Sequence, residues 1–191
     1  MSNNKIEFRE LTDLERLPEI HALAYEGLLE NGYILPNTSQ QKSIHPHLDN
    51  LEETSVIVGE CNGQIIATDT ITIDGSQGLS TDVYFGSKTN EIRRQYGKIA
   101  CLWRFCTEKM NRNRISLVID MMNFLLDQLH RKEVEVGLTI VEKRHKKIHQ
   151  KLFGAQIIEE KKIQIEKDSK EIEVVLMMFE IDRIQNIRKG K

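Results

Sequence analysis

One arginine lies inside an apolar run, and its chemistry needs an explanation. The run, residues 97–108, reads GKIACLWRFCTE and is apolar on both faces, which predicts a central strand covered on both sides. A lone guanidinium is costly to bury, so Arg104 either pairs with an internal carboxylate or faces a cleft that holds a ligand. In either case we expect a bidentate contact with a carboxylate. The sequence leaves both interpretations open.

A basic turn follows this strand. Residues 111–116 read NRNRIS and precede a long apolar helix, so the order is buried strand, basic turn and helix N-terminus. Such an order suits an anionic ligand, because the first backbone N–H groups of a helix are free to donate. Arg112, Asn113 and Arg114 are therefore candidate anion-binding residues. A solvated basic turn is the alternative.

The histidines and cysteines do not form a metal motif. His45 and His47 flank a proline, and a lone H-x-H pair is too weak a pattern for a metal site, so we predict none. The three cysteines make an odd number without metal-type spacing, which indicates reduced thiols in a cytoplasmic protein. They are Cys61, Cys101 and Cys106.

The N-terminal half of the chain supplies strands beside residues 97–108. Residues 5–11 alternate and predict a first strand, and Thr12 with Glu15 has the form of a capping box that starts a helix ending near 31–32. A β-hairpin turns at 62–63, where Asn-Gly separates two β-rich runs. Residues 33–53 lack periodicity and form either a pocket wall or an ordinary surface connection.

The C-terminal half adds helices to both sides of the predicted sheet. Its order predicts one α/β domain over residues 1–182, with a mixed sheet and helices on both faces, and a basic, mobile tail over 183–191. The predicted elements are a short helix over 88–95, a strongly apolar helix over 116–131, a strand over 134–141, a basic helix over 145–153 and a hairpin over 155–166 and 171–181.

Composition excludes some function classes. The 191 residues include 27 basic and 29 acidic ones, so the chain as a whole has no charge excess that would favour nucleic acid or a membrane surface. No apolar run is long enough to span a bilayer, and the N-terminus has no signal-peptide pattern. We therefore expect a cytoplasmic protein with no transmembrane segment; its oligomeric state is not indicated.

The order of elements resembles the GCN5-related N-acetyltransferase (GNAT) fold. Residues 142–154, EKRHKKIHQKLFG, are similar to the P-x-H-x-x-F-Y-x-x-L-G-F segment of these transferases. Residues 100–106 are similar to the E-x-(S/T)-R-F strand of the branch that contains acyl-homoserine-lactone synthases and N-acyl amino acid synthases. The runs EGLLENGYI at 26–34 and QGLSTDVYF at 77–85 also look like that branch.

This resemblance implies transfer of an acyl group from a phosphopantetheine thioester, acyl-ACP or acyl-CoA, to the amine of an amino-acid-like acceptor. In the family a bulge splays the central strand from its neighbour, and the pantetheine arm lies in the gap. A bulge here would turn both Cys101 and Arg104 toward one cleft, because they are three residues apart. The residues implied at the substrate are Arg104, Trp103, Phe105 and Tyr33, and those implied at the phosphopantetheine are Arg112, Asn113, Arg114 and His145.

The chain departs from the family at its usual catalytic positions. The base glutamate falls at Cys101, which would either accept the acyl group covalently or be an inert core thiol. The acid tyrosine falls at His149, which would serve as acid to the thiolate or base to the amine, unless it is a surface histidine. His145 matches a family histidine, with helix capping or packing as the alternative. The Q-x-x-G-x-G loop of coenzyme A users is missing, which favours an acyl carrier protein as donor.

Three functions remain open. The first is an N-acyltransferase of the N-acyl amino acid synthase or autoinducer synthase type. The second is an inactive module of the same fold that binds acyl carrier protein or an acyl ligand, because both usual catalytic residues are replaced. The third is an acetyl-CoA-dependent N-acetyltransferase.

Overall fold

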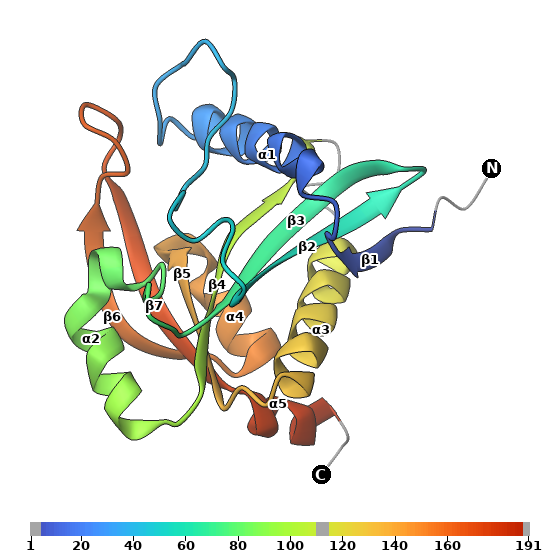
Figure 1. Ribbon diagram of the computed structural model, residues 1–191. Helices are drawn as coiled ribbons and strands as arrows, with labels where there is room; N and C mark the ends of the chain where they lie inside the picture. The colour runs from blue at the N-terminus through green and yellow to red at the C-terminus, as the bar shows by residue number, and fades with distance from the viewer. Residues whose placement is uncertain (1–4, 110–114, 189–191) are drawn as a thin grey trace.

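The computed structural model describes residues 5–109 and 115–188, with the backbone alone for 185–188. Figure 1 shows a twisted sheet with helices on both sides. In chain order the elements are β1 (Glu7–Glu10), a 3-10 turn (Leu14–Arg16), α1 (Leu17–Glu30), β2 (Thr54–Cys61), β3 (Gln64–Ile73), α2 (Asp82–Gln95), β4 (Ile99–Thr107), α3 (Ile115–Arg131), β5 (Val136–Glu142), a 3-10 turn (Lys143–His145), α4 (Lys146–Phe153), β6 (Gln156–Ile163), β7 (Ile172–Glu180) and α5 (Ile181–Arg188).

The seven strands form one sheet in the order β1-β2-β3-β4-β5-β7-β6. Only the pair β4–β5 is parallel; the other five neighbouring pairs are antiparallel. Both hairpins, β2–β3 and β6–β7, are those that the sequence predicts. The parallel pair is connected through α3, whose apolar face packs against the sheet.

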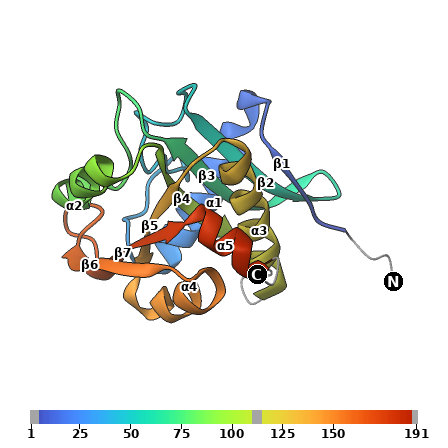
Figure 2. The same ribbon diagram turned by 90° about the horizontal axis from the view of Figure 1, so that it is seen from below.

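The two faces of the sheet carry separate hydrophobic cores. Helices α3, α4 and α5 cover one face, which Figure 2 shows from below, and Leu102 of β4 belongs to their core. On the other face, α2 and the irregular segment 31–53 share a core with Trp103 of β4, while α1 packs over β2 and β3. Because Leu102 and Trp103 are successive, β4 sends side chains into both cores, as predicted.

Three local predictions need correction. The N-cap residue of the 3-10 turn that leads into α1 is Asp13 rather than Thr12, since its carboxylate accepts a hydrogen bond from the backbone N–H of Glu15 at 3.0 Å. Helix α2 begins at Asp82, six residues before the predicted 88–95, and is kinked at Phe85; Arg93 in its last turn binds the Asp82 carboxylate. The tail that was predicted to start at residue 183 is instead helical up to Arg188, because α5 spans Ile181–Arg188. Ile184 of this helix is buried in the core that contains α3.

Candidate active site

A β-bulge at Arg104 shapes the centre of the molecule. Thr70 of β3 pairs with Trp103 and Thr68 pairs with Cys106, so two residues of β4 face Asp69 alone. Arg104 adopts φ = 70°, a left-handed conformation that is unusual for a residue with a side chain and typical of the first residue of such a bulge. The predicted bulge is therefore present.

Beyond the bulge, β4 and β5 separate. They are paired only from Ile99 with Val136 to Leu102 with Thr139, although β4 continues to Thr107 and β5 to Glu142. The predicted gap in the middle of the sheet is therefore confirmed. A cavity of about 500 Å3 occupies it.

The cavity passes from one face of the sheet to the other. Its lining includes Leu102, Met122 and Phe179 from the core under α3, and Tyr33 and Trp103 from the opposite core. Most of the lining is apolar, and only a few polar side chains enter it, as is typical of small-molecule sites. Besides Tyr33, Tyr84 and Cys106, the polar and ionisable lining residues are His45, Asp69, Ser80, Arg104, Thr139, Glu142, His145 and His149.

Arg104 is held by an internal acid. Its side chain is 0% exposed, and its Nη1 donates to Asp49 Oδ1. Nε and Nη2 both donate to Thr70 Oγ1, at 3.1 and 2.9 Å, and the guanidinium lies 4.5 Å from the Trp103 ring centre. The carboxylate contact is therefore through one nitrogen, and the predicted bidentate contact is wrong because Thr70 takes the other two nitrogens.

Asp49 is itself fixed by three groups from three segments. Besides Arg104, its carboxylate accepts from the hydroxyl of Ser43 and lies 3.2 Å from His21 Nε2 of α1. This network ties the irregular segment 31–53 to β4 and makes it a wall of the cavity, the first of the two readings that its sequence allows.

Three other predicted substrate residues line the cavity. Trp103 is buried, its Nε1 donates to Thr72 Oγ1 at 2.9 Å, and the His45 ring packs edge-on against it at 5.1 Å. Phe105 is 41% exposed and lies at the cavity's rim. Tyr33 is buried, and burial together with a hydrogen bond to Glu142 raises its pKa to about 12.

The two histidines of the α4 region both reach the cavity. His149 is half-buried beside Phe153, with ring centres 5.8 Å apart, so it is not a surface histidine. Burial and the neighbouring His145 lower the pKa of His149 to about 4, which leaves its imidazole neutral at pH 7. His145 occupies the N-cap position of α4, but its side chain makes no capping hydrogen bond.

Cys101 does not share the cleft with Arg104. It is 0% exposed and absent from the cavity lining, and Ser80 Oγ donates to its sulfur at 3.2 Å. Burial raises the pKa of its thiol to about 11, which disfavours the thiolate. The bulge does put both residues on one face, but Ser80 lies between the sulfur and the cavity.

Two acids in the lining were missed by the sequence analysis. Glu142 ends β5, and Arg144 pairs with it at 2.7 Å. Asp69 is 2% exposed, and its Oδ1 accepts from the backbone N–H of Thr70 at 2.7 Å. Burial raises the pKa of Asp69 to about 8, against smaller opposing effects of the Thr70 hydrogen bond and of the nearby Arg104. The sequence did carry a signal for Asp69, because it is a single acidic residue inside a β-rich run.

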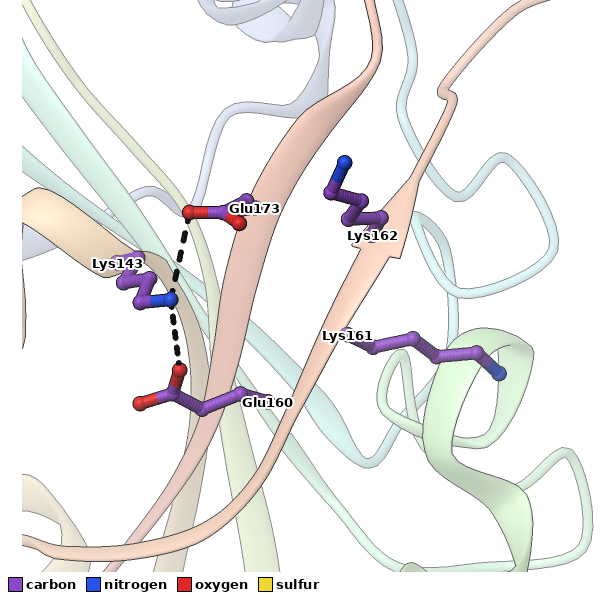
Figure 3. A pocket seen from close by; sticks show the side chains of 5 residues that line it. All are labelled: Lys143, Glu160, Lys161, Lys162 and Glu173. Carbon is purple, nitrogen blue, oxygen red and sulfur yellow. Dashed lines mark ion pairs between the residues drawn. The ribbon is translucent and has the colours of Figure 1, made fainter.

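Some predicted positions and features lie elsewhere. Arg112, Asn113 and Arg114 fall outside the described residues, so their proposed contacts with an anion stay predictions. A second hollow of about 230 Å3 lies on β6 and β7 (Figure 3), where Lys143 pairs with both Glu160 and Glu173. Its lining consists of three lysines and two glutamates and carries no catalytic pattern. Within 5–109 and 115–188, no helix is long and apolar enough to span a bilayer.

Comparison with known families agrees with this geometry. The family model described as "N-acyl amino acid synthase FeeM" matches residues 19–180, most of the chain. The chain belongs to the FeeM family. A member of this family is an acyltransferase, which is the function class that the sequence resemblance implies. None of the curated proteins matches the sequence.

Solved structures confirm the fold. FeeM, an N-acyl amino acid synthase from uncultured soil microbes, superposes with a TM-score of 0.79 at 12% identity, over 95% of this chain and 94% of that one. The AHL synthase LasI gives 0.67 at 13%, over 94% and 91%. The putative acetyltransferase yncA from Salmonella typhimurium, solved with acetyl-CoA, gives 0.60 at 13%, over 94% and 95%. At such identities these likenesses establish the GNAT fold alone.

Proposed function

We propose that this FeeM-family protein transfers a fatty acyl group from a phosphopantetheine thioester to the amine of an amino-acid-like acceptor. The observation that carries the proposal is the apolar cavity of about 500 Å3 in the gap between β4 and β5. A gap in a sheet is costly because it leaves backbone groups without strand partners, so its presence favours a ligand that occupies it. A thioester arm is narrow enough to enter such a gap.

The donor is acyl-ACP or acyl-CoA, and the acyl chain would lie along the apolar lining. Side chains such as Met122, Val118 and Ile148 line the part of the cavity next to α3 and α4. Burying each methylene of an acyl chain there contributes about 0.8 kcal/mol. A fatty acyl group therefore gains more from this cavity than an acetyl group does.

The reaction needs only modest help, because a thioester is already activated. The acceptor amine attacks the thioester carbonyl carbon, a C–N bond forms, and the C–S bond breaks to release the thiol. We assign His149 as the group that accepts the amine proton, since its neutral imidazole lines the cavity. Arg104, Trp103 and Tyr33 shape the acceptor end, and Cys101 takes no part.

A product assay tests the proposal. The purified protein is incubated with acyl-ACP or acyl-CoA and with single amino acids, and mass spectrometry quantifies the N-acyl product while a thiol reagent measures release. We expect one product per thiol released. Donor binding without thiol release for every acceptor would contradict the proposal and favour a binding module; turnover with acetyl-CoA alone would favour an acetyltransferase.

A further inference from the structure

Asp69 is a buried acid that the proposed mechanism leaves without a role. It lies on β3 between Ala67 and Ile71, which belong to the core under α3, so its side chain points to that face. It faces the two residues of β4 at the bulge, Arg104 and Phe105, and it lines the cavity. An apolar core does not need a carboxyl group at this place, and an asparagine would make the same hydrogen bond to Thr70.

The surroundings of Asp69 keep a proton on it. It is 2% exposed, and its hydrogen bond from the Thr70 N–H at 2.7 Å is the one that the described structure records for its side chain. Arg104 is the charge that acts on it, but that guanidinium donates to Asp49 and Thr70. Cys106 is the other titratable neighbour, and burial raises the pKa of its thiol to about 12, so it stays neutral.

We propose that Asp69 is the acid of the reaction, and that its carboxyl proton passes to the departing thiolate as the C–S bond breaks. This inference rests on the proposed acyl transfer. The proton balance closes, because His149 takes one proton from the amine, Asp69 gives one to the sulfur, and both groups then exchange with solvent. The products are an amide and a free thiol.

The other ionisable groups of the cavity fit this role less well. Tyr33 is too weak an acid, because burial and its hydrogen bond to Glu142 raise its pKa to about 12. The carboxylate of Glu142 is already engaged, because it accepts hydrogen bonds from Tyr33 and Arg144. The pKa of Asp69, about 8, is close to that of a thiol, about 8.5, so proton transfer between them is nearly balanced.

The test compares leaving groups. Asp69→Asn keeps an oxygen that can accept from the Thr70 N–H and replaces the acidic O–H by an NH2 group that is not an acid, so we expect a folded protein. With an alkyl thioester such as acyl-CoA, single-turnover thiol release should fall about 100-fold; with an acyl thiophenyl ester, whose thiolate leaves without an acid, the loss should shrink to less than about 10-fold. Asp120→Asn makes the same change at an exposed position of α3 and is the matched control.

Several outcomes overturn the assignment. It fails if Asp69→Asn releases thiol from acyl-CoA within about twofold of the parent protein, or if its loss is equal for both esters, which indicates a structural role only. It also fails if Tyr33→Phe, not Asp69→Asn, shows the leaving-group dependence. If the parent protein acylates no acceptor from any donor, the proposed function itself fails, and so does the assignment of Asp69 as its acid.

A spectroscopic measurement is independent of turnover. The infrared difference between the parent protein and Asp69→Asn should show the band of a protonated carboxyl at neutral pH, which disappears as the pH rises through about 8. A carboxylate band at neutral pH in place of it would overturn the assignment even if the acyl transfer is confirmed.

Discussion

Arg104 and Asp49, fifty-five residues apart in the chain, form a buried ion pair beside the cavity. Their side chains are 0% and 6% exposed, so neither charge is shielded by bulk water. The pair ties the irregular segment 31–53 to β4 and supports the bulge. Together with Thr70, Asp49 thus already occupies the Nε, Nη1 and Nη2 atoms of Arg104.

Removing one partner of this pair should destabilise the fold. Asp49→Ala leaves a buried guanidinium without its counter-ion, which costs about 3–5 kcal/mol in the free energy of unfolding. Urea denaturation measures it. The double variant Asp49→Leu with Arg104→Met should recover much of the loss, because a buried pair replaced by apolar residues is often neutral. A double variant no more stable than Asp49→Ala would contradict this account of the pair.

His149→Ala should slow acyl transfer about 100-fold while leaving the melting temperature nearly unchanged. Lys147→Ala, on the same helix and exposed, is the matched control and should keep the parent rate. Because the pKa of His149 is lowered to about 4, its imidazole accepts protons throughout the neutral range, and the His149-dependent rate is lost only as the pH falls toward about 4. A parent-like rate in His149→Ala would exclude His149 as the group that accepts the amine proton.

Cys101→Ala should retain turnover within about twofold, since the sulfur is buried, accepts a hydrogen bond from Ser80 and takes no part in the proposed transfer. The lost packing should cost about 1 kcal/mol in unfolding free energy. Mass spectrometry of the intact protein, quenched during turnover, should show no acyl adduct. An adduct that disappears in Cys101→Ala would instead establish a two-step transfer.

Gly137→Ala should disturb both the sheet and the cavity. Gly137 faces Phe179 across β5 and β7, and a Cβ at Gly137 would overlap the Phe179 ring. The crowding should cost about 1–3 kcal/mol, measured by thermal unfolding, and should push the ring toward the cavity that it lines. We therefore expect weaker binding of the acyl donor, measured by calorimetry. Undiminished donor binding would show that the cavity wall adapts.

Asp69→Asn should stabilise the protein in mild alkali. The folded state holds the Asp69 proton up to a pH of about 8, whereas the unfolded chain releases it from a pH of about 4. The folded state thus binds more protons in this window, and stability falls as the pH rises through it. The variant lacks this dependence, so its melting temperature should exceed the parent's most clearly at pH 8 and above. Parallel pH dependences in the two proteins would show that Asp69 is ionised in the fold.

Much of the fold could be predicted because hydrophobic periodicity is local. The two hairpins, the α3 helix and the buried strand β4 all follow from short patterns. The bulge is implied by the family resemblance, and the three-residue spacing of Cys101 and Arg104 agrees with it, because a bulge reverses the parity of a strand.

The partners of the site residues could not be predicted in the same way. Asp49 lies in a segment without periodicity, so no local pattern places it beside Arg104. Ser80, which separates Cys101 from the cavity, comes from an irregular connection as well. Asp69 did carry a signal, a charge in a β-rich run, but its proximity to the cavity depends on the register of β3 against β4.

The most direct measurement is a crystal structure of the protein with a non-hydrolysable thioether analogue of its acyl donor. The account predicts the thioether sulfur between the separated ends of β4 and β5, near Trp103 and Glu142, with the acyl chain along the apolar lining. An analogue bound elsewhere, with the strands unchanged and the cavity empty, would contradict it.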